Sequence, residues 1–234
     1  MKKIFLLVFF LGGWLYGQDL TMDLDYEVTY EVPQPRKGTS DTLTVYMTKD
    51  GRYLLTEENI LGDQMGRDVF KDPSIDFSQS SSLLMLDTQE MMIYMNLKVA
   101  KNNLFFKMDL MNFIPVDTSN PMNEELELIT EKLDQGATIN GVSYDTYSVY
   151  PNNEPDKPML MTVDTKKPVN NNNIFAKFFE IMMNKTASTG QINYDIPEGL
   201  IVQLELGNNV LIRAIETKKI SKKITLSHNF SIEE

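Results

Sequence analysis

Acidic side chains are the most numerous groups in this chain that could do chemistry. Asp23, Asp25 and Glu27 alternate along the stretch DLDYE. A second group follows at Glu124, Glu125 and Glu127. Two carboxylates can serve as general acid and base, so a carboxylate-dependent hydrolase is one hypothesis. Calcium also binds carboxylates, but DLDYE lacks the glycine-bent loop of a dedicated site. Solvated charge, on a strand for the first group and in a loop for the second, is the expected explanation of both.

Other residue types and motifs that commonly carry catalysis are few in this chain. The chain has no cysteine and one histidine, His228. Disulfides, a thiolate metal site and a thiol nucleophile are therefore excluded. His228 alternates with Leu226 and Phe230, so we interpret it as an ordinary residue of a strand and not as the base of a Ser–His–Asp triad. There is no histidine pair for zinc, no P-loop and no Rossmann glycine pattern, so we predict no cofactor, no metal and no enzyme activity.

Methionines are the other unusual feature, above all in the stretch EMMIYMNL at residues 90–97. Alternation places Met91, Ile93 and Met95 on one strand face, and Phe106 and Met108 continue an apolar face nearby. Methionine is flexible and polarizable, so it suits either a loosely packed core or a deformable hydrophobic pocket. Strand alternation scatters the sulfur atoms, which disfavours a copper(I) site.

Period-two alternation recurs along most of the chain and predicts short strands. In MDLDYEVTYEV it separates an apolar face from an acidic one, and Asp50-Gly51 and Asn140-Gly141 supply hairpin turns. About ten strands are expected, including a hairpin through 207–209 and a separate last strand over 222–233. The sequence thus predicts a mainly β fold: one strongly curved antiparallel sheet, a half-barrel.

One segment departs from this pattern and predicts a helix over Asn173–Thr186. Its apolar residues recur at helical spacing, and the asparagine run before it can cap the first turn. A helix with so wide an apolar stripe is expected to cover the concave face of the sheet. The predicted hydrophobic pocket between helix and sheet is lined by Met91, Ile93, Met95, Phe106, Met108, Phe175, Phe178, Phe179 and Met182.

The first 17 residues have the form of a signal peptide. Lys2 and Lys3 precede an apolar run from Ile4 to Tyr16, which is too short to span a membrane, and Gly17 suits cleavage before Gln18. No later run is long enough for a transmembrane segment, and no cysteine follows for a lipid anchor. The formal charge is −11, and it becomes −13 once both lysines leave. Such a charge argues against nucleic acid as a partner.

The order of these segments resembles a known family. A signal peptide, the hairpin LTVYMTKDGRYLL, the stretch ITEKLDQGATINGVSYDTYSVY, a helix and IPEGLIVQLELG follow one another. This order is similar to that of the exported bacterial domain-of-unknown-function 4412 family, which in turn resembles the half-barrel fold of periplasmic lipoprotein carriers. Members of that family often carry a cysteine where this chain has Asp145 and Thr146. The resemblance implies one domain over 18–234 and a periplasmic or secreted location.

Three classes of function are therefore expected, in descending order. The first is a non-catalytic binder or carrier of a hydrophobic small molecule or lipid, with the helix as a lid. The second is an envelope protein-interaction module with a fully packed core, whose strand edges or acidic face meet a protein partner. The third is the hydrolase that uses Asp23, Asp25 or Glu125.

Overall fold

The architecture comes from a computed structural model. It describes residues 20–58, 80–99, 102–113, 127–152, 154–156, 158–184, 193–207 and 209–226. The predicted signal peptide, His228, Glu124 and Glu125 lie outside these ranges.

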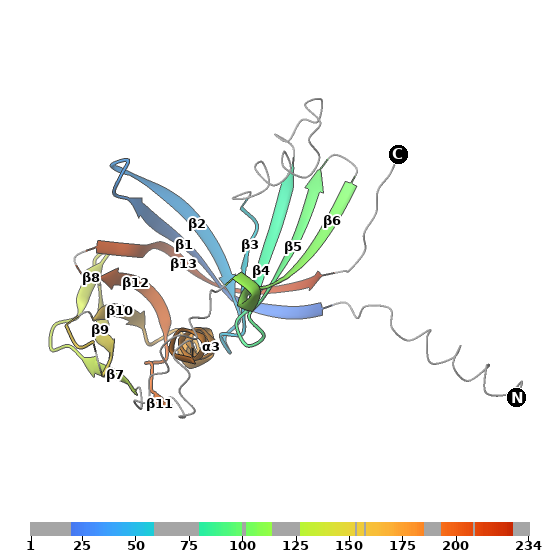
Figure 1. The fold of residues 1–234 in the computed structure, drawn as a ribbon. Coiled ribbons are helices and arrows are strands. Elements are labelled where there is room, and N and C mark those ends of the chain that lie inside the picture. Colours follow the sequence, from blue (N-terminus) through green and yellow to red (C-terminus); the bar gives the residue numbers. More distant parts are fainter. Residues whose placement is uncertain are drawn as a thin grey trace, which may run out of the picture.

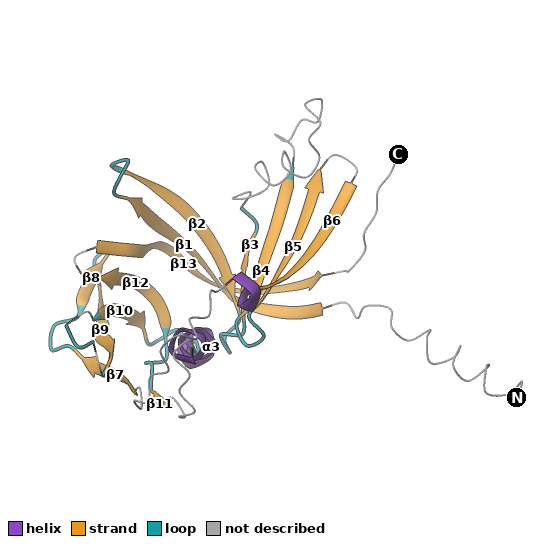
Figure 2. Ribbon diagram, in the orientation of Figure 1, coloured by secondary structure: helices purple, strands orange, loops and turns teal. Residues whose placement is uncertain are grey.

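Thirteen strands, one α-helix and one short 3-10 helix make up the described chain (Figures 1 and 2). The strands are β1 (Leu20–Gln34), β2 (Thr39–Met47), β3 (Tyr53–Thr56), β4 (Ser81–Asp87), β5 (Met92–Val99), β6 (Asn102–Asp109), β7 (Glu127–Lys132), β8 (Ala137–Ile139), β9 (Val142–Pro151), β10 (Met159–Asp164), β11 (Asn193–Tyr194), β12 (Leu200–Leu206) and β13 (Asn209–Leu226). The helices are α3 (Asn171–Asn184) and η2 (Leu110–Phe113).

All the strands belong to one sheet. Its order is β11-β7-β9-β10-β12-β13-β1-β2-β3-β4-β5-β6, and β8 pairs with β9 beside this path. Every pairing is antiparallel except the short one between β11 and β7. The two ends of the order do not pair, so the sheet stays open, and it twists strongly (Figure 1). The predicted mainly β fold, a curved antiparallel sheet with a helix, is confirmed.

The long strands β1 and β13 form the centre of the sheet. Along β1 every second residue from Met22 to Tyr30 is buried, as the alternation predicted. A register shift opposite Asp25 lets the β1–β13 pair bend and continue beneath β3–β6 (Figure 1). The prediction of two strands over this last region was wrong. β13 is continuous because the lysine-rich stretch 217–223 contains no glycine or proline to end it.

Three clusters of buried side chains form the core. The central cluster contains Tyr26, Val28, Tyr30, Met47, Ile139, Val169, Leu200, Val202 and Ala214. The meander cluster contains Met22, Leu24, Tyr53, Leu55, Met85 and Leu226. The helix cluster contains Leu128, Val149, Met161, Val163, Ile196 and Ile201. Because β1 supplies residues to the first two, its bend joins the two halves of the sheet.

Helix α3 confirms the predicted helix and begins two residues earlier, at Asn171. The side-chain oxygen of Asn170 accepts a hydrogen bond of 3.1 Å from the backbone N–H of Asn173, which is an N-cap. Ile174 packs against the central cluster and Phe175 against the helix cluster. The helix therefore lies against the half of the sheet formed by β7–β12.

Candidate functional site

An apolar wall lies on one face of β4, β5 and β6. Two rows cross these strands in register, so their side chains point to the same side. We define the wall by these two rows, Leu84–Met95–Phe106 and Leu86–Ile93–Met108. Met95 is buried, with 1% of its surface exposed, and the other five are partly exposed. None of the six belongs to the three core clusters described above.

The structure distributes the predicted pocket residues over three places. Ile93, Met95, Phe106 and Met108 share the wall. Met91 is buried in the turn before β5 and has a positive φ of 51°, and its carbonyl oxygen accepts a hydrogen bond of 3.0 Å from the backbone N–H of Leu110.

The predicted helix residues do not join the wall in the described chain. Phe175 packs on the helix cluster, which contains Met161 and Val163. The side chains of Phe178, Phe179 and Met182 lie outside the described part of α3. The described residues thus bring four members of the predicted pocket together and place Phe175 against different strands.

A groove of about 540 Å³ opens at the bend of β1. It lies between the start of β1, the β2–β3 turn, the segment that enters α3 and the segment before β12. Its lining residues are Thr21, Met22, Asp23, Asp25, Thr48, Lys49, Asp50, Tyr53, Pro168, Val169, Asn170 and Glu198. These segments are distant in sequence, so the groove exists only in the folded chain.

Backbone hydrogen bonds hold the walls of this groove in place. Asp25 Oδ2 accepts a bond of 2.7 Å from the backbone N–H of Lys49, and the Lys49 carbonyl accepts one of 3.0 Å from Asn170. In another wall, the side-chain Nδ2 of Asn171 donates to the backbone carbonyl oxygens of Pro197 and Gly199, at 2.7 and 2.8 Å. The asparagine run therefore ties three walls together.

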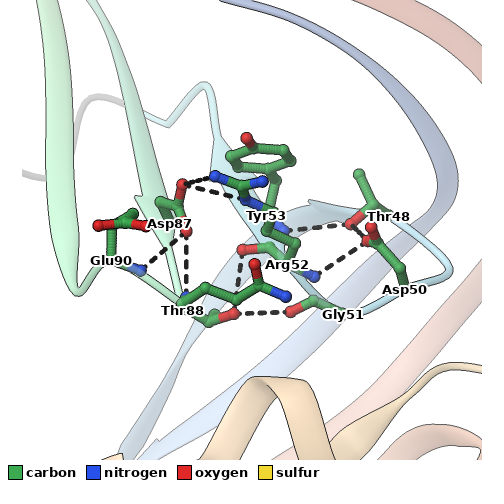
Figure 3. Close-up of polar contacts among 9 residues, drawn as sticks. Thr48, Asp50, Gly51, Arg52, Tyr53, Asp87, Thr88 and Glu90 are labelled. Carbon is green, nitrogen blue, oxygen red and sulfur yellow. Dashed lines mark hydrogen bonds and ion pairs between the residues drawn. The ribbon is translucent and has the colours of Figure 1, made fainter. Parts of the chain in front are cut away.

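The β2–β3 turn is further held by a polar network (Figure 3). Arg52 donates two hydrogen bonds to Asp87, at 3.2 and 2.9 Å. These hydrogen bonds raise the pKa of the Arg52 guanidinium. The Thr88 hydroxyl lies 3.0 Å from the carbonyl oxygens of Gly51 and Arg52. The Thr48 hydroxyl donates to Asp50 and accepts from the backbone of Tyr53.

Comparisons of the chain with protein-family models, with curated proteins and with solved structures find no match. The likeness to the domain-of-unknown-function 4412 family accordingly stays a prediction. Among the described helices, none has the length and apolar character needed to cross a membrane.

The carboxylates at the groove differ in how they are used. Asp25 and Asp50 accept hydrogen bonds from the β2–β3 turn. The side chains of Asp23 and Glu198 are exposed and have no hydrogen bond or ion pair within the described structure. No group of three or more acidic or histidine side chains in the described ranges could hold a metal ion.

Sequence reasoning singled out Asp23 and Asp25 but missed the other groove residues. Lys49 and Tyr53 flank the recognised Asp50-Gly51 turn, and Glu198 lies in the stretch IPEG. The turn itself was a usable signal. What the sequence did not contain was the proximity of that turn to Asn170 and Glu198.

Proposed function

We propose that this chain is an exported, non-catalytic protein that binds a hydrophobic ligand, such as a lipid or an acyl chain, on the apolar wall. The proposal depends on one observation: six large apolar side chains lie in register on one sheet face, and five of them keep part of their surface exposed. Contiguous apolar surface of this kind is typical of binding sites. Met108, the partly exposed methionine of the wall, can conform to ligands of different shape.

Burial provides the binding energy. Each CH₂ group removed from water contributes roughly 0.8 kcal/mol, so an acyl chain of moderate length suffices for micromolar binding after ordering costs. The ligand would lie across β5 and β6, where Ile93, Phe106 and Met108 are partly exposed. No carboxylate pair is needed for this function.

Two adjacent phenylalanines provide a matched test. Phe106 lies on the wall, whereas Phe105 points to the opposite face, where its ring lies 6.3 Å from that of Tyr94. Phe106→Ser should weaken binding of a fluorescent fatty acid by roughly ten-fold or more, since it removes one large apolar contact. Phe105→Ser should change the affinity by less than about two-fold.

Titration of both variants against the parent protein measures this difference, with urea unfolding as the check that each variant is folded. If Phe105→Ser and Phe106→Ser weaken binding equally, the wall is not the ligand site. Native mass spectrometry of the protein from its own host would identify a co-purified lipid. The same sample reports export, because the mature chain is expected to begin at Gln18.

A second candidate, a protein-interaction module, is favoured by the position of β6. This strand ends the sheet order, and no described strand pairs with its outer edge. Its eight residues carry two charges and no proline, which is little protection against pairing with another strand. Asn103→Lys should reduce capture of a partner by cross-linking in the host while leaving fatty-acid binding unchanged. Loss of fatty-acid binding with unchanged cross-linking would favour the wall alone.

A further inference from the structure

We infer that the groove at the bend of β1 binds a small organic cation, namely an amine or guanidinium group on a short apolar stem. This site is separate from the apolar wall and does not depend on the proposed lipid function. It is a built cavity whose lining combines an apolar floor, an acidic rim and fixed walls.

The size and floor of the groove suit a small molecule. Its volume of about 540 Å³ lies within the range of small-ligand pockets. Met22, Tyr53 and Val169 contribute buried apolar surface, with 5%, 9% and 1% of each side chain exposed. Pro168 extends this floor towards the helix entrance. A hydrocarbon stem would be removed from water here.

The charges of the lining favour a positive ligand. Asp23, Asp25, Asp50 and Glu198 stand against a single basic residue, Lys49. Asp25 and Asp50 already accept hydrogen bonds from backbone or hydroxyl groups of the β2–β3 turn. Asp23 and Glu198 are the two carboxylates that remain available, and they come from opposite ends of the chain. A concave surface whose lining is mainly negative concentrates positive ions.

An organic cation fits this arrangement better than a metal ion. Calcium requires six to eight oxygen ligands at close range, and no described acidic group is dense enough to hold a metal. An ammonium or guanidinium group needs only one or two carboxylates as charge-assisted hydrogen-bond acceptors. The apolar floor, which a metal ion could not use, accommodates the stem.

The walls are organised before a ligand arrives. The Lys49 backbone is held at 2.7 Å by Asp25 and at 3.0 Å by Asn170. The side chain of Asn173 donates to the Asp50 carbonyl oxygen at 2.7 Å. The loop that carries Glu198 is held by Asn171, through the carbonyl oxygens of Pro197 and Gly199. Binding therefore requires little rearrangement, which preserves affinity.

The test uses the fluorescent amine dansylcadaverine and its N-acetylated analogue, which has the same stem without the positive charge. The full-length mature protein should bind the amine and bind the acetylated probe at least ten-fold more weakly. Asp23→Asn and Glu198→Gln should each weaken amine binding about three- to ten-fold, and the double variant more. Raising the salt concentration from 50 to 500 mM should also weaken it, because the carboxylates are exposed.

Asp41→Asn is the matched control, since it removes an exposed carboxylate from β2, outside the groove lining. It should leave amine affinity unchanged, and all variants should keep the parent's urea midpoint and fatty-acid affinity. Equal binding of the amine and its acetylated analogue would overturn the inference. So would equal amine affinity of the parent and the folded double variant. Because fatty-acid binding is measured separately, failure here is distinguishable from failure of the proposed lipid function.

Discussion

The backbone of Gly51 lies directly against the carbonyl oxygen of Asn170. A Cβ atom added to Gly51 would overlap that oxygen and would also lie 3.0 Å from Cγ1 of Ile174. The turn and the helix entrance are also joined by the hydrogen bond of 3.0 Å from Asn170 to Lys49. This close approach sets the distance between two walls of the groove, and only glycine permits it.

Gly51→Ala should therefore destabilise the fold markedly. Gly51 has a φ of 73°, so alanine would cost about 1–2 kcal/mol from backbone strain, and the overlap with Asn170 adds to it. We expect a total loss of roughly 3 kcal/mol, measured as the free energy of unfolding in urea.

Gly38→Ala is the control for this substitution. Gly38 has a similar φ of 63°, but no atom lies within 4 Å of the position that its Cβ would occupy. It should lose only about 1–2 kcal/mol. Equal losses at the two glycines would mean that backbone strain alone matters and that the contact with Asn170 does not.

The Arg52–Asp87 ion pair should be important for stability because one partner is buried. The Asp87 side chain is 2% exposed, and its Oδ1 accepts hydrogen bonds from the backbones of Gln89 and Glu90 at 3.0 and 3.1 Å. Asp87→Ala leaves these donors and the Arg52 guanidinium without an acceptor. We expect a loss of about 2–4 kcal/mol in urea unfolding.

A surface ion pair offers the comparison. Lys132 and Asp145 are 2.8 Å apart, but their side chains are 55% and 40% exposed. Asp145→Ala should cost less than about 1 kcal/mol. If the two aspartate variants lose the same stability, burial does not explain the role of Asp87.

Stability should fall at alkaline pH because of Tyr30. Burial raises the pKa of its hydroxyl well above the ordinary value, and that hydroxyl donates a hydrogen bond of 2.8 Å to the Ile201 carbonyl oxygen. In the unfolded chain the group ionises near pH 10, whereas in the folded chain it stays protonated. The unfolded state therefore binds fewer protons above pH 10, so stability is complete below that pH and is lost as the pH rises.

Tyr30→Phe isolates this contribution. At pH 8 the variant should lose about 1 kcal/mol, since the hydrogen bond to Ile201 is gone. Between pH 10 and 11 its stability should fall less steeply than that of the parent, by up to about 1.4 kcal/mol per pH unit. Urea unfolding at several pH values measures both quantities. Parallel pH profiles would show that Tyr30 does not titrate in the unfolding equilibrium.

Local patterns in the sequence predicted the elements of this fold but not their long-range arrangement. Alternation identified the buried face of β1, and the turn residues Asp50-Gly51 and Asn140-Gly141 were located correctly. Each of these signals depends on neighbouring residues. The count of about ten strands fell short of thirteen partly because β8 and β11, with three and two residues, are too short to show an alternation.

The groove could not be predicted because its residues are distant in sequence, whereas each sequence signal depends on neighbouring residues. Its lining comes from four segments that span residues 21 to 198, and it forms where β1 bends opposite a shift in register with β13. No residue type in β1 indicates that shift, because it depends on the pairing partner. The asparagine run did predict the N-cap of α3, but not that Asn171 would bind the loop before β12.

Asn171 gives the sharpest test of how that loop is held. Its side chain is fully buried and donates to two carbonyl oxygens, while no described donor reaches its own Oδ1. Asn171→Ala should cost about 2–4 kcal/mol at any pH between 4 and 7, since two buried carbonyl groups lose their donor.

Asn171→Asp has the same shape but places a carboxyl group against those oxygens. Burial and repulsion then favour its protonated form, so the folded-state pKa exceeds the unfolded value of about 3.9. The aspartate variant should be most stable below pH 4, where its single O–H can still donate to one of the two carbonyl groups, and lose stability steadily as the pH rises to 7. Urea unfolding across this range measures it, and a flat profile for Asn171→Asp would mean that water reaches residue 171.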